Sequence, residues 1–467
     1  MLRLFDTASR AVRELDPRDP GKVSMYVCGP TVYDLPHIGH GRLTLVFDVL
    51  RRYLIFSGYD VRFVENVTDI DDNIIGRAAR EGRSESEVAQ QYEAEWWKAM
   101  DALGALRPTV TPHATEYVAD MVALVADLLE RGVAYRTSNG VYLDTEQIAD
   151  YGLLAGQPLD SLRAGARVET DEEKRSPLDF VLWKAAREGQ PKWPAPFGDG
   201  RPGWHTECVV MSLDLLGEDF DLHGGGQDLR FPHHENERAQ AEAEGRRFAR
   251  HWAHNGWVVV EGEKMSKSLG NFTTLPDLLE RSDGRAYRLL VLRSHYRAPI
   301  EVTTETIAQA EASLERLDAL ARRFGVPNPL ADTDAVVRGE GPAAGALDLV
   351  VDRFVERLDD DLDTPGALAD LFELVSRANS LADAGDDEVA RQLAQTIVVL
   401  CAALGLAVKG DVDELDEETQ ELVAARDAAR AAKNWDEADR LRDELVVRGW
   451  VVEDGLTGTV VRRRPGA

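Results

Sequence analysis

Residues 25–40 of the chain are MYVCGPTVYDLPHIGH. The apolar and β-branched run from Val23 to Val27 predicts a short buried strand, which the following Gly-Pro pair ends. From about Gly39 the chain predicts a helix, because apolar residues recur at spacings of three and four until Gly58 stops them. The stretch therefore predicts a strand, a loop and a helix, as in an α/β fold. A ligand in an open parallel sheet binds at the carboxyl ends of the strands.

Two motifs carry residues that suit phosphate. The start of the predicted helix has His37 and His40 around Gly39, where free N–H groups, the positive helix end and a residue without a side chain favour an anion. Far downstream, residues 262–268 are GEKMSKS, a basic and hydroxyl-rich loop whose Lys264 and Lys267 could neutralise a departing pyrophosphate. Either motif alone is more often an ordinary solvated cap or loop, so the interpretation depends on finding both.

Together and in this order, the two motifs resemble the nucleotide-binding motifs of class I aminoacyl-tRNA synthetases. In or between them lie Cys28 and the runs GWHTEC (203–208), HGGG (223–226) and FPHHENE (231–237). This combination resembles the cysteinyl-tRNA synthetase family, over nearly the whole chain and most densely in residues 1–75 and 175–275. The resemblance implies an α/β protein: a Rossmann-like nucleotide-binding catalytic domain split by a connective insertion, then an α-helical bundle and a small α+β C-terminal anticodon-binding domain.

The expected domain boundaries follow changes of pattern along the chain. Residues 1–110 alternate strand-like and helical segments, whereas the turn-rich residues 111–200 resemble the connective insertion and are too short for an editing domain. Residues 201–302 return to the α/β pattern and include the 262–268 loop (the KMSKS loop of the family) and a stem-contact region. Residues 303–410 have the long helical periodicities of a bundle. Residues 411–467 predict a helix pair and a β ribbon.

Three local predictions concern the second half of the catalytic domain. Phe220 to His223 predicts a strand, Gly224 to Gly226 a tight loop, and residues 232–244 a helix.

Composition is that of a globular protein large enough for about two to four domains. The three cysteines, Cys28, Cys208 and Cys401, exclude a disulfide framework. No apolar run reaches the ~20 residues of a membrane helix, and the N-terminus lacks a secretory layout. We therefore expect a cytoplasmic, monomeric protein with no membrane partner.

The net charge of −29 argues weakly against a nucleic-acid partner, because affinity for phosphate comes from Lys and Arg. If RNA binds, basic residues must gather locally. Two groups of basic residues are available: Arg462 to Arg464 at the C-terminus, and Lys264, Lys267, Arg281, Arg285, Arg288, Arg293 and Arg297 in and after the 262–268 loop.

The resemblance implies one zinc ion per chain, held by Cys28, Cys208, His233 and Glu237. Thiolate, imidazole and carboxylate are ordinary zinc ligands, and a spacing of four puts His233 and Glu237 on one helix face. Without the resemblance, the better interpretation would be two buried cysteines that pack as small apolar residues and a helix with an ordinary polar face. The other residues that the resemblance assigns to the cysteine pocket are Thr68, Trp204, His223 and His234.

The implied reaction begins with attack of the cysteine carboxylate on the α-phosphate of ATP, which gives cysteinyl-adenylate and pyrophosphate. No protein nucleophile is needed, since positioning and charge stabilisation suffice. Zinc prefers a soft thiolate to a neutral hydroxyl, so it could select cysteine over serine without editing. Magnesium would accompany the nucleotide. The residues implied in ATP binding and catalysis are His37, Gly39, His40, Lys264, Ser266, Lys267 and Ser268.

In the second step cysteine passes to the 3′ end of tRNA(Cys). The helix expected from Trp435 offers an aromatic stacking face and, one turn later, a base-edge acceptor at Asp439. By resemblance Asp454 and the terminal arginines join them as anticodon contacts, although Val461 stands where the family often has an aromatic residue. A single Trp more often packs within its own domain.

Two alternatives remain. The mycothiol-pathway ligase also activates cysteine but joins it to an amino sugar; that ligase typically has proline before the tyrosine that is Tyr33 here, and the long helical C-terminal region also argues against it. A non-catalytic paralogue that binds tRNA or an amino acid would be expected to have decayed motifs, whereas both nucleotide motifs and all four candidate ligands are intact.

Overall fold

The computed structural model describes residues 1–156, 173–259, 274–410, 415–455 and 458–463. Its centre is a four-stranded parallel sheet in the order β10-β9-β3-β4. The strands are β3 (Lys22–Val27), β4 (Asp60–Glu65), β9 (Leu222–Gly226) and β10 (Trp252–Asn255). This confirms the predicted α/β class and the strand–loop–helix order of the opening stretch.

Strand β3 sends its side chains to two different cores. Met25 and Val27 join a large apolar cluster with α1 (Ile38–Phe56) and the C-terminal helices. Tyr26 and Cys28 belong instead to a second cluster with α6 (Trp204–Leu216) and α7 (Glu235–Ala243). Because side chains alternate along a strand, this register directs the Cys28 thiol toward α6 and α7.

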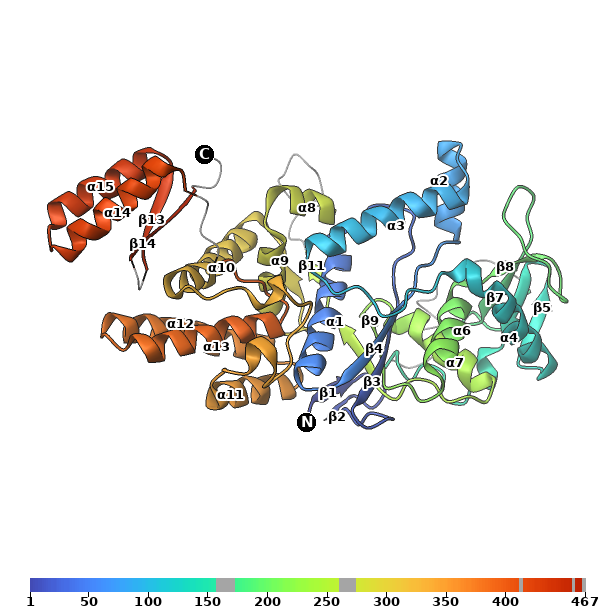
Figure 1. The fold of residues 1–467 in the computed structure, drawn as a ribbon. Helices are drawn as coiled ribbons and strands as arrows, with labels where there is room; N and C mark the ends of the chain where they lie inside the picture. Colours follow the sequence, from blue (N-terminus) through green and yellow to red (C-terminus); the bar gives the residue numbers. More distant parts are fainter. Residues whose placement is uncertain (157–172, 260–273, 411–414, 456–457, 464–467) are drawn as a thin grey trace.

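A long insertion separates the two halves of the parallel sheet. Figure 1 shows its antiparallel sheet, in the order β5-β6-β7-β8, at one end of the molecule beside α4. Its strands are β5 (Ala134–Thr137), β6 (Gly140–Leu143), β7 (Phe180–Ala185) and β8 (Gly200–Pro202). The helices between β4 and β6 are α2 (Asp72–Glu81), α3 (Glu85–Ala102), η1 (Ala114–Tyr117) and α4 (Val118–Glu130), and η2 (Thr145–Gln147) follows β6.

Helices dominate the part of the chain after the parallel sheet. Two short strands, β11 (Val258–Val259) and β12 (Ile300–Glu301), pair in parallel beside it, and an N-terminal hairpin joins β1 (Arg3–Asp6) to β2 (Ala11–Glu14). The helices are α8 (Leu275–Arg281), α9 (Gly284–Leu292), α10 (Thr304–Phe324), η5 (Pro329–Ala331), η6 (Gly341–Ala343), α11 (Asp348–Asp359), α12 (Thr364–Asp383) and α13 (Asp387–Ala403).

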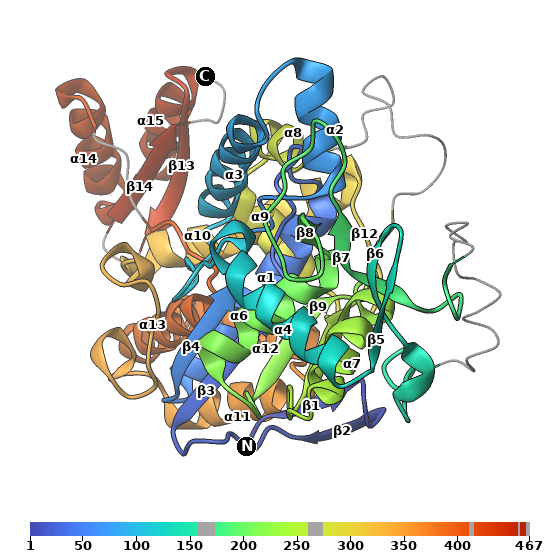
Figure 2. The ribbon, with the colours of Figure 1, turned by 90° about the vertical axis from the view of Figure 1, so that its right-hand side faces the viewer.

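The last elements form a small unit of their own. They are α14 (Glu417–Ala431), α15 (Trp435–Val447) and the antiparallel pair β13 (Trp450–Gly455) and β14 (Gly458–Arg463). Figures 1 and 2 show them together at the end of the molecule away from the insertion. The predicted helix pair and ribbon are confirmed.

Two local predictions need correction. Gly224 to Gly226 are not a tight loop but the last three residues of β9, where glycine is required because a Cβ at Gly224 would lie 2.3 Å from the Phe47 ring. The helix predicted from residue 232 begins as α7 at Glu235; a kinked turn, η3 (Arg230–His234), with a cis Phe231–Pro232 bond precedes it.

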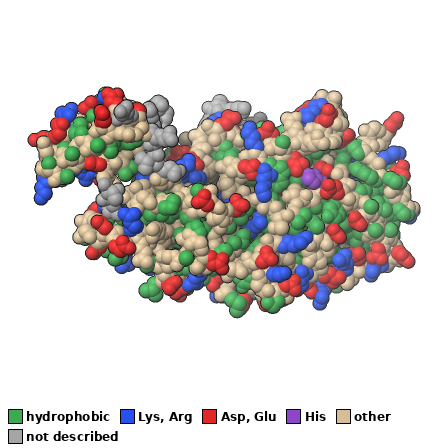
Figure 3. Space-filling model, viewed as in Figure 1, with side chains coloured by type: hydrophobic (Ala, Val, Ile, Leu, Met, Phe, Trp, Pro, Cys, Tyr) green, Lys and Arg blue, Asp and Glu red, His purple; other side chains and the backbone are tan. Residues whose placement is uncertain are grey.

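The arginines after the 262–268 loop do not form a free basic patch. Arg288 is buried and pairs with Asp48, and Arg285 pairs with Asp283 and Asp318. Arg281 and Arg297 also have carboxylate partners, and only Arg293 of this group lies exposed without an ion pair in the described part of the chain. Most of these cations therefore hold the fold together, and Figure 3 shows acidic and basic side chains interspersed on one face.

Within the described ranges, no helix combines the length and apolar character that crossing a bilayer would require.

Candidate active site

Four side chains from distant parts of the chain meet behind the carboxyl end of β3. Cys28 follows that strand, Cys208 lies on α6, and His233 and Glu237 flank the start of α7. Their ligand atoms all lie within 4.8 Å of one another, and all four residues are buried. We call Cys28, Cys208, His233 and Glu237 the four-residue cluster.

The spacing of the four-residue cluster suits a tetrahedral metal ion. The Cys208 sulfur lies 3.7 Å from the Cys28 sulfur and 3.7 Å from His233 Nε2. Glu237 Oε1 lies 3.4 Å from the Cys28 sulfur and 3.0 Å from His233 Nε2. Zinc bonds of ~2.3 Å to sulfur and ~2.0 Å to nitrogen give tetrahedron edges of roughly 3.3–3.8 Å. The donor set and its spacing therefore fit zinc.

Charge within the cluster also suits a cation. The hydrogen bond from Cys28 lowers the pKa of Cys208 to about 6, although burial acts in the opposite direction. Burial alone would lower the pKa of His233, but Glu237 and Cys208 raise it to about 10. Burial raises the pKa of Cys28 well above its ordinary value. Buried thiolate and carboxylate groups are stable only with a nearby positive charge, which a metal ion would supply.

His223 and His234, which the resemblance assigns to the cysteine pocket, lie against the four-residue cluster. His223 Nε2 donates to Glu237 Oε2 at 2.7 Å, so the two carboxylate oxygens face different partners. His223 could also join Cys28, His234 and Glu237 as a second possible metal-ligand set. The four-residue cluster is the better choice, because it leaves His223 to orient Glu237 from outside. His223 Nδ1 and His234 Nε2 are buried without a hydrogen-bond partner among the described residues.

Trp204 and His205 lie beside His233. The sequence predicts Trp204 for the cysteine pocket but does not predict His205. Trp204 stacks on the His233 ring at 4.0 Å between centroids and is 38% exposed, so it forms an accessible wall of the site. The Nδ1 atoms of His205 and His233 lie 2.8 Å apart. Because His233 Nε2 faces the cluster, Nδ1 is left to donate to His205, which fixes the His233 ring. Its place in the GWHTEC run was the only sequence signal for His205.

The start of α1 presents two stacked imidazoles. The ring centroids of His37 and His40 lie 3.5 Å apart. The Nδ1 atom of each residue accepts the backbone N–H of the other at 3.2 Å. Each Nδ1 is therefore unprotonated, and each Nε2 carries the proton as a donor. Burial lowers the pKa of His40 to about 3, so the ring is neutral at pH 7. A Cβ at Gly39 would lie 3.0 Å from the His37 ring, which explains the glycine.

Lys264, Ser266, Lys267 and Ser268 lie outside the described residues. The segment before them is tied to α1: buried Arg42 donates to the carbonyl oxygens of Trp257, Tyr296 and Ala298. The backbone on that side is thus held beside the helix that carries His37 and His40.

Thr68 lies in a buried polar network that also contains two residues absent from the sequence prediction. Its hydroxyl donates to Glu207 Oε2 at 2.7 Å and accepts from Asn66 Nδ2 at 3.2 Å. Asn66 Oδ1 accepts the Gly29 N–H at 2.9 Å and lies 3.8 Å from the Cys208 sulfur. The network therefore connects Thr68 to the four-residue cluster.

The C-terminal candidates lie on α15 and β13, which Figure 1 shows far from α6 and α7. Trp435 opens α15 with its side chain 57% exposed, and Asp439 is exposed on the same helix. Asp454 pairs with Arg426 and Arg430. More than half of the surface of Trp435 is therefore accessible to a ligand.

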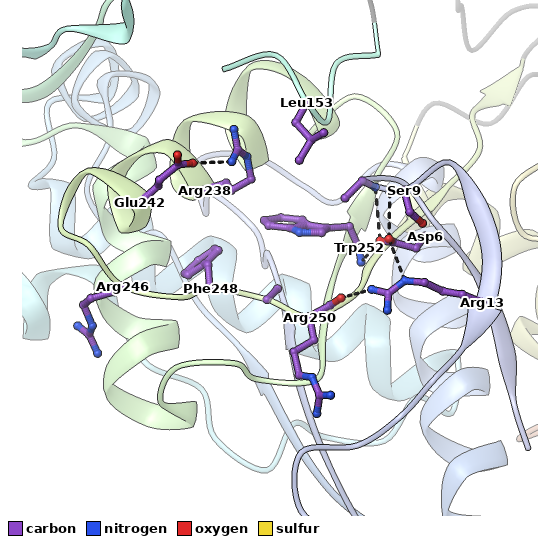
Figure 4. Close-up of a pocket in the computed structure, with 12 residues that line it drawn as sticks. Asp6, Ser9, Arg13, Leu153, Arg238, Glu242, Arg246, Phe248, Arg250 and Trp252 are labelled. Carbon is purple, nitrogen blue, oxygen red and sulfur yellow. Dashed lines mark hydrogen bonds and ion pairs between the residues drawn. The ribbon is translucent and has the colours of Figure 1, made fainter. Parts of the chain in front are cut away.

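A separate surface hollow of about 550 Å³ lies near the N-terminal hairpin (Figure 4). Trp252 lines it and also stacks on His223, at 4.6 Å between centroids. Its arginines are paired, Arg238 with Glu242 and Arg13 with Asp6. None of the residues that line the hollow was predicted for the site.

Comparison with known proteins assigns the chain to a family. Residues 14–312 match the class I (C) catalytic domain of tRNA synthetases, residues 353–409 the DALR domain, and residues 412–463 the cysteinyl-tRNA ligase anticodon binding domain. The cysteine–tRNA ligase of Chromobacterium violaceum is 46% identical over 468 residues, covering 99% of this chain and 100% of that protein. The cysteine–tRNA ligase of Caldicellulosiruptor saccharolyticus is 43% identical over 467 residues, with the same coverage.

Solved structures share the fold at low identity. Mycobacterium tuberculosis methionyl-tRNA synthetase in complex with methionyl-adenylate has a TM-score of 0.58 at 16% identity, covering 82% of this chain and 89% of that one. A putative arginyl-tRNA synthetase from Campylobacter jejuni has a TM-score of 0.53 at 13% identity, covering 84% and 93%. The relatives with high identity, not these structures, identify the family: the chain belongs to the cysteine–tRNA ligases, with a class I synthetase catalytic domain.

Proposed function

We propose that this protein activates L-cysteine with ATP, releasing pyrophosphate, and transfers the cysteine to the 3′ end of tRNA(Cys). The observation that carries the proposal is the four-residue cluster, which lies at the carboxyl end of β3, just before the loop that leads to α1. That edge of a parallel sheet is where class I nucleotide-binding folds hold their ligands. Family membership supports the same activity.

We further propose that the four-residue cluster holds one zinc ion. A zinc ion there would supply a preference for thiolate sulfur over hydroxyl oxygen. His223 and His205 would hold Glu237 and His233 in place from outside the cluster.

His37 and His40 are proposed to bind the phosphates of ATP. Both rings are oriented through Nδ1, which leaves two Nε2–H donors above the N-terminus of α1. Neutral donors and the positive helix end stabilise an anion without needing a protonated ring. Lys264 and Lys267 are proposed to neutralise the departing pyrophosphate, with Ser266 and Ser268 in the same loop and magnesium on the nucleotide.

The match of residues 412–463 to an anticodon binding domain supports tRNA, rather than an amino sugar, as the acceptor. We propose Trp435 and Asp439 as anticodon contacts, because both are exposed on one helix. Asp454, which forms an ion pair with Arg426, is proposed as the third anticodon contact.

The test is Cys208→Ser, assayed for metal content and for cysteine-dependent ATP–pyrophosphate exchange. The wild-type protein should carry about one zinc per chain. The variant should lose zinc and at least ~100-fold of its exchange rate, since one thiolate ligand and its charge are gone. Cys401→Ser is the matched control: it makes the same change at a buried cysteine of α13 and should keep both metal and exchange.

Serine provides the second arm of this test. If sulfur is selected at the cluster, serine should fail to support exchange before any tRNA is added. A Cys208→Ser protein with full metal and full exchange would contradict the zinc proposal. A wild-type protein that activates no cysteine at all would contradict the function.

A further inference from the structure

The turn between α11 and α12 contains two residues in an uncommon backbone conformation. Asp361 and Leu362 are consecutive and have φ angles of 56° and 55°. This left-handed region is unfavourable for residues with a side chain, and more so for leucine than for aspartate. Such a conformation persists only where its surroundings hold it in place. The contacts of the Asp361 side chain supply that hold.

The Asp361 carboxylate is buried and binds two distant parts of the chain. Its Oδ1 accepts the backbone N–H of Phe5 in β1 at 2.8 Å and the hydroxyl of Tyr296 at 2.9 Å. Its Oδ2 accepts from Arg297 Nε at 2.9 Å and lies 3.6 Å from His295 Nε2. Three consecutive side chains after α9 therefore converge on this one carboxylate.

The backbone of the same segment binds α1. Arg42 of α1 is fully buried, and it forms no ion pair with any carboxylate among the described residues. Its Nη2 donates to the carbonyl oxygens of Tyr296, at 3.1 Å, and Ala298, and its Nη1 donates to that of Trp257 at 2.5 Å. A buried guanidinium without a carboxylate depends on such acceptors for its stability. The position of Arg42 therefore follows the position of these three carbonyl groups.

Arg42 connects this segment to the histidines that are proposed to bind phosphate. It lies two residues after His40 on α1, and His37 is the N-cap of that helix. Because hydrogen bonds make the backbone rigid from one helical turn to the next, a displacement of Arg42 displaces both rings. Contacts thus lead from the α11–α12 turn through residues 296–298 to the start of α1.

We propose that Asp361 is a positioning residue for ATP, which sets the place of His37 and His40 through residues 296–298 and Arg42. The inference rests on the proposed function, because it concerns the residues proposed to bind the phosphates. It gives the helical bundle, whose residues 353–409 match the DALR domain, a part in cysteine activation.

The two apolar cores make the expected effect selective. Leu362 and Tyr296 belong to the large cluster that contains α1, whereas Cys28 and Cys208 belong to the second cluster with α6 and α7. Loss of the Asp361 contacts should therefore disturb the ATP side of the site and leave the cysteine side unchanged.

The test is Asp361→Asn in the full-length protein, assayed by pyrophosphate exchange with ATP and cysteine varied separately. Asparagine keeps the shape and tolerates the left-handed backbone. Its oxygen can still accept from Phe5 and Tyr296, but its amide nitrogen then faces Arg297, so that two donors oppose each other. The KM for ATP should rise ~5-fold or more, because the groups that bind phosphate are displaced. The KM for cysteine and the zinc content should not change.

Asp360→Asn is the matched control, since it makes the same change at the exposed neighbour in the same turn and should leave both KM values at the wild-type level. Tyr296→Phe removes only the other side-chain contact of Asp361 with this segment. It should raise the KM for ATP ~3-fold, which keeps the test decisive if Asp361→Asn folds poorly.

The outcomes separate the positioning role from the proposed function. An unchanged KM for ATP in both Asp361→Asn and Tyr296→Phe would overturn the positioning role alone. An equal rise of the KM for ATP and the KM for cysteine would also overturn it, because it would indicate a general disturbance of the fold. A wild-type protein without cysteine-dependent exchange would overturn the proposed function and the positioning role together.

Discussion

Glu65 illustrates at the residue scale how burial alters a titration. The residue ends β4, is 4% exposed, and its Oε1 has no hydrogen-bond partner in the described structure. Burial raises its pKa to about 8, against an ordinary value of 4.5, with Arg51 acting weakly in the other direction. The folded state therefore keeps a proton that the unfolded chain loses between pH 4.5 and 8.

The retained proton makes the stability of the folded state depend on pH. The free energy of unfolding of the wild type should fall as pH rises from about 5 to 8.5, and Glu65→Gln should remove the corresponding part of the fall. The variant should match the wild type near pH 5 and be more stable by about 3–5 kcal/mol at pH 8.5. Urea unfolding at both pH values measures this. Equal differences at the two pH values would show that Glu65 does not titrate in this range.

The sequence could identify some residues of the site but not others. Cys28, Cys208, His233 and Glu237 could be named because their motifs resemble a family, and the structure brings them together. Asn66 and Glu207 could not, since each is an ordinary polar residue until folding places it. The Thr68–Glu207 hydrogen bond joins residues 139 positions apart, a separation on which local pattern carries no information.

At the scale of elements, the strand β9 was the least predictable part of the site. Three consecutive glycines indicate a loop by propensity, yet they form strand pairs with β10 and, at Gly224, with β3. The reason is tertiary: Phe47 of α1 and His234 occupy the space that side chains at Gly224 and Gly225 would fill. The amphipathic helices of the bundle were predicted well, because their pattern itself specifies burial.

Gly224→Ala tests this account of β9. An added Cβ would lie 2.3 Å from the buried Phe47 ring, so the variant should be destabilised by about 1–3 kcal/mol and have a lower thermal midpoint. Shortening the neighbour in a Phe47→Leu, Gly224→Ala double variant should recover part of the loss. Gly345→Ala is the control, since a Cβ there meets nothing within 4 Å. If the double variant were no more stable than expected from two independent losses, steric contact with Phe47 would not be the cause.

At the scale of the whole molecule, buried ion pairs join parts that sequence patterns treat separately. Asp48 of α1 binds Arg52 and Arg288, and Arg288 also donates to the carbonyl of Leu404 beyond α13. The helix that carries His37 and His40 is thereby attached to the bundle. Charged residues in a sequence reveal neither their burial nor their partners, which is why the sequence alone does not distinguish Arg285 and Arg288 from surface cations.

The C-terminal unit is attached much more loosely. Its apolar residues form clusters separate from the main core, around Leu445 and Trp450 and around Ala438 and Leu441. Its contact with the bundle includes an ion pair between Arg322 and Glu453. The unit can therefore be removed without opening the catalytic core.

The last prediction uses this separation. Deletion of residues 411–467 should leave cysteine-dependent pyrophosphate exchange largely intact, because the four-residue cluster and the α1 histidines lie in the retained part. Charging of tRNA(Cys) should fall by ~10-fold or more, since stacking on an aromatic side chain contributes about 1–3 kcal/mol per base.

Full-length Trp435→Ala should reproduce part of that loss, as a higher KM for tRNA with unchanged exchange. Val447→Ala, at the other end of α15 and 86% exposed, should charge normally. A truncated protein that charges tRNA at the full-length rate would show that this unit does not read the anticodon, and tRNA recognition would then have to come from the surface around the insertion and the bundle.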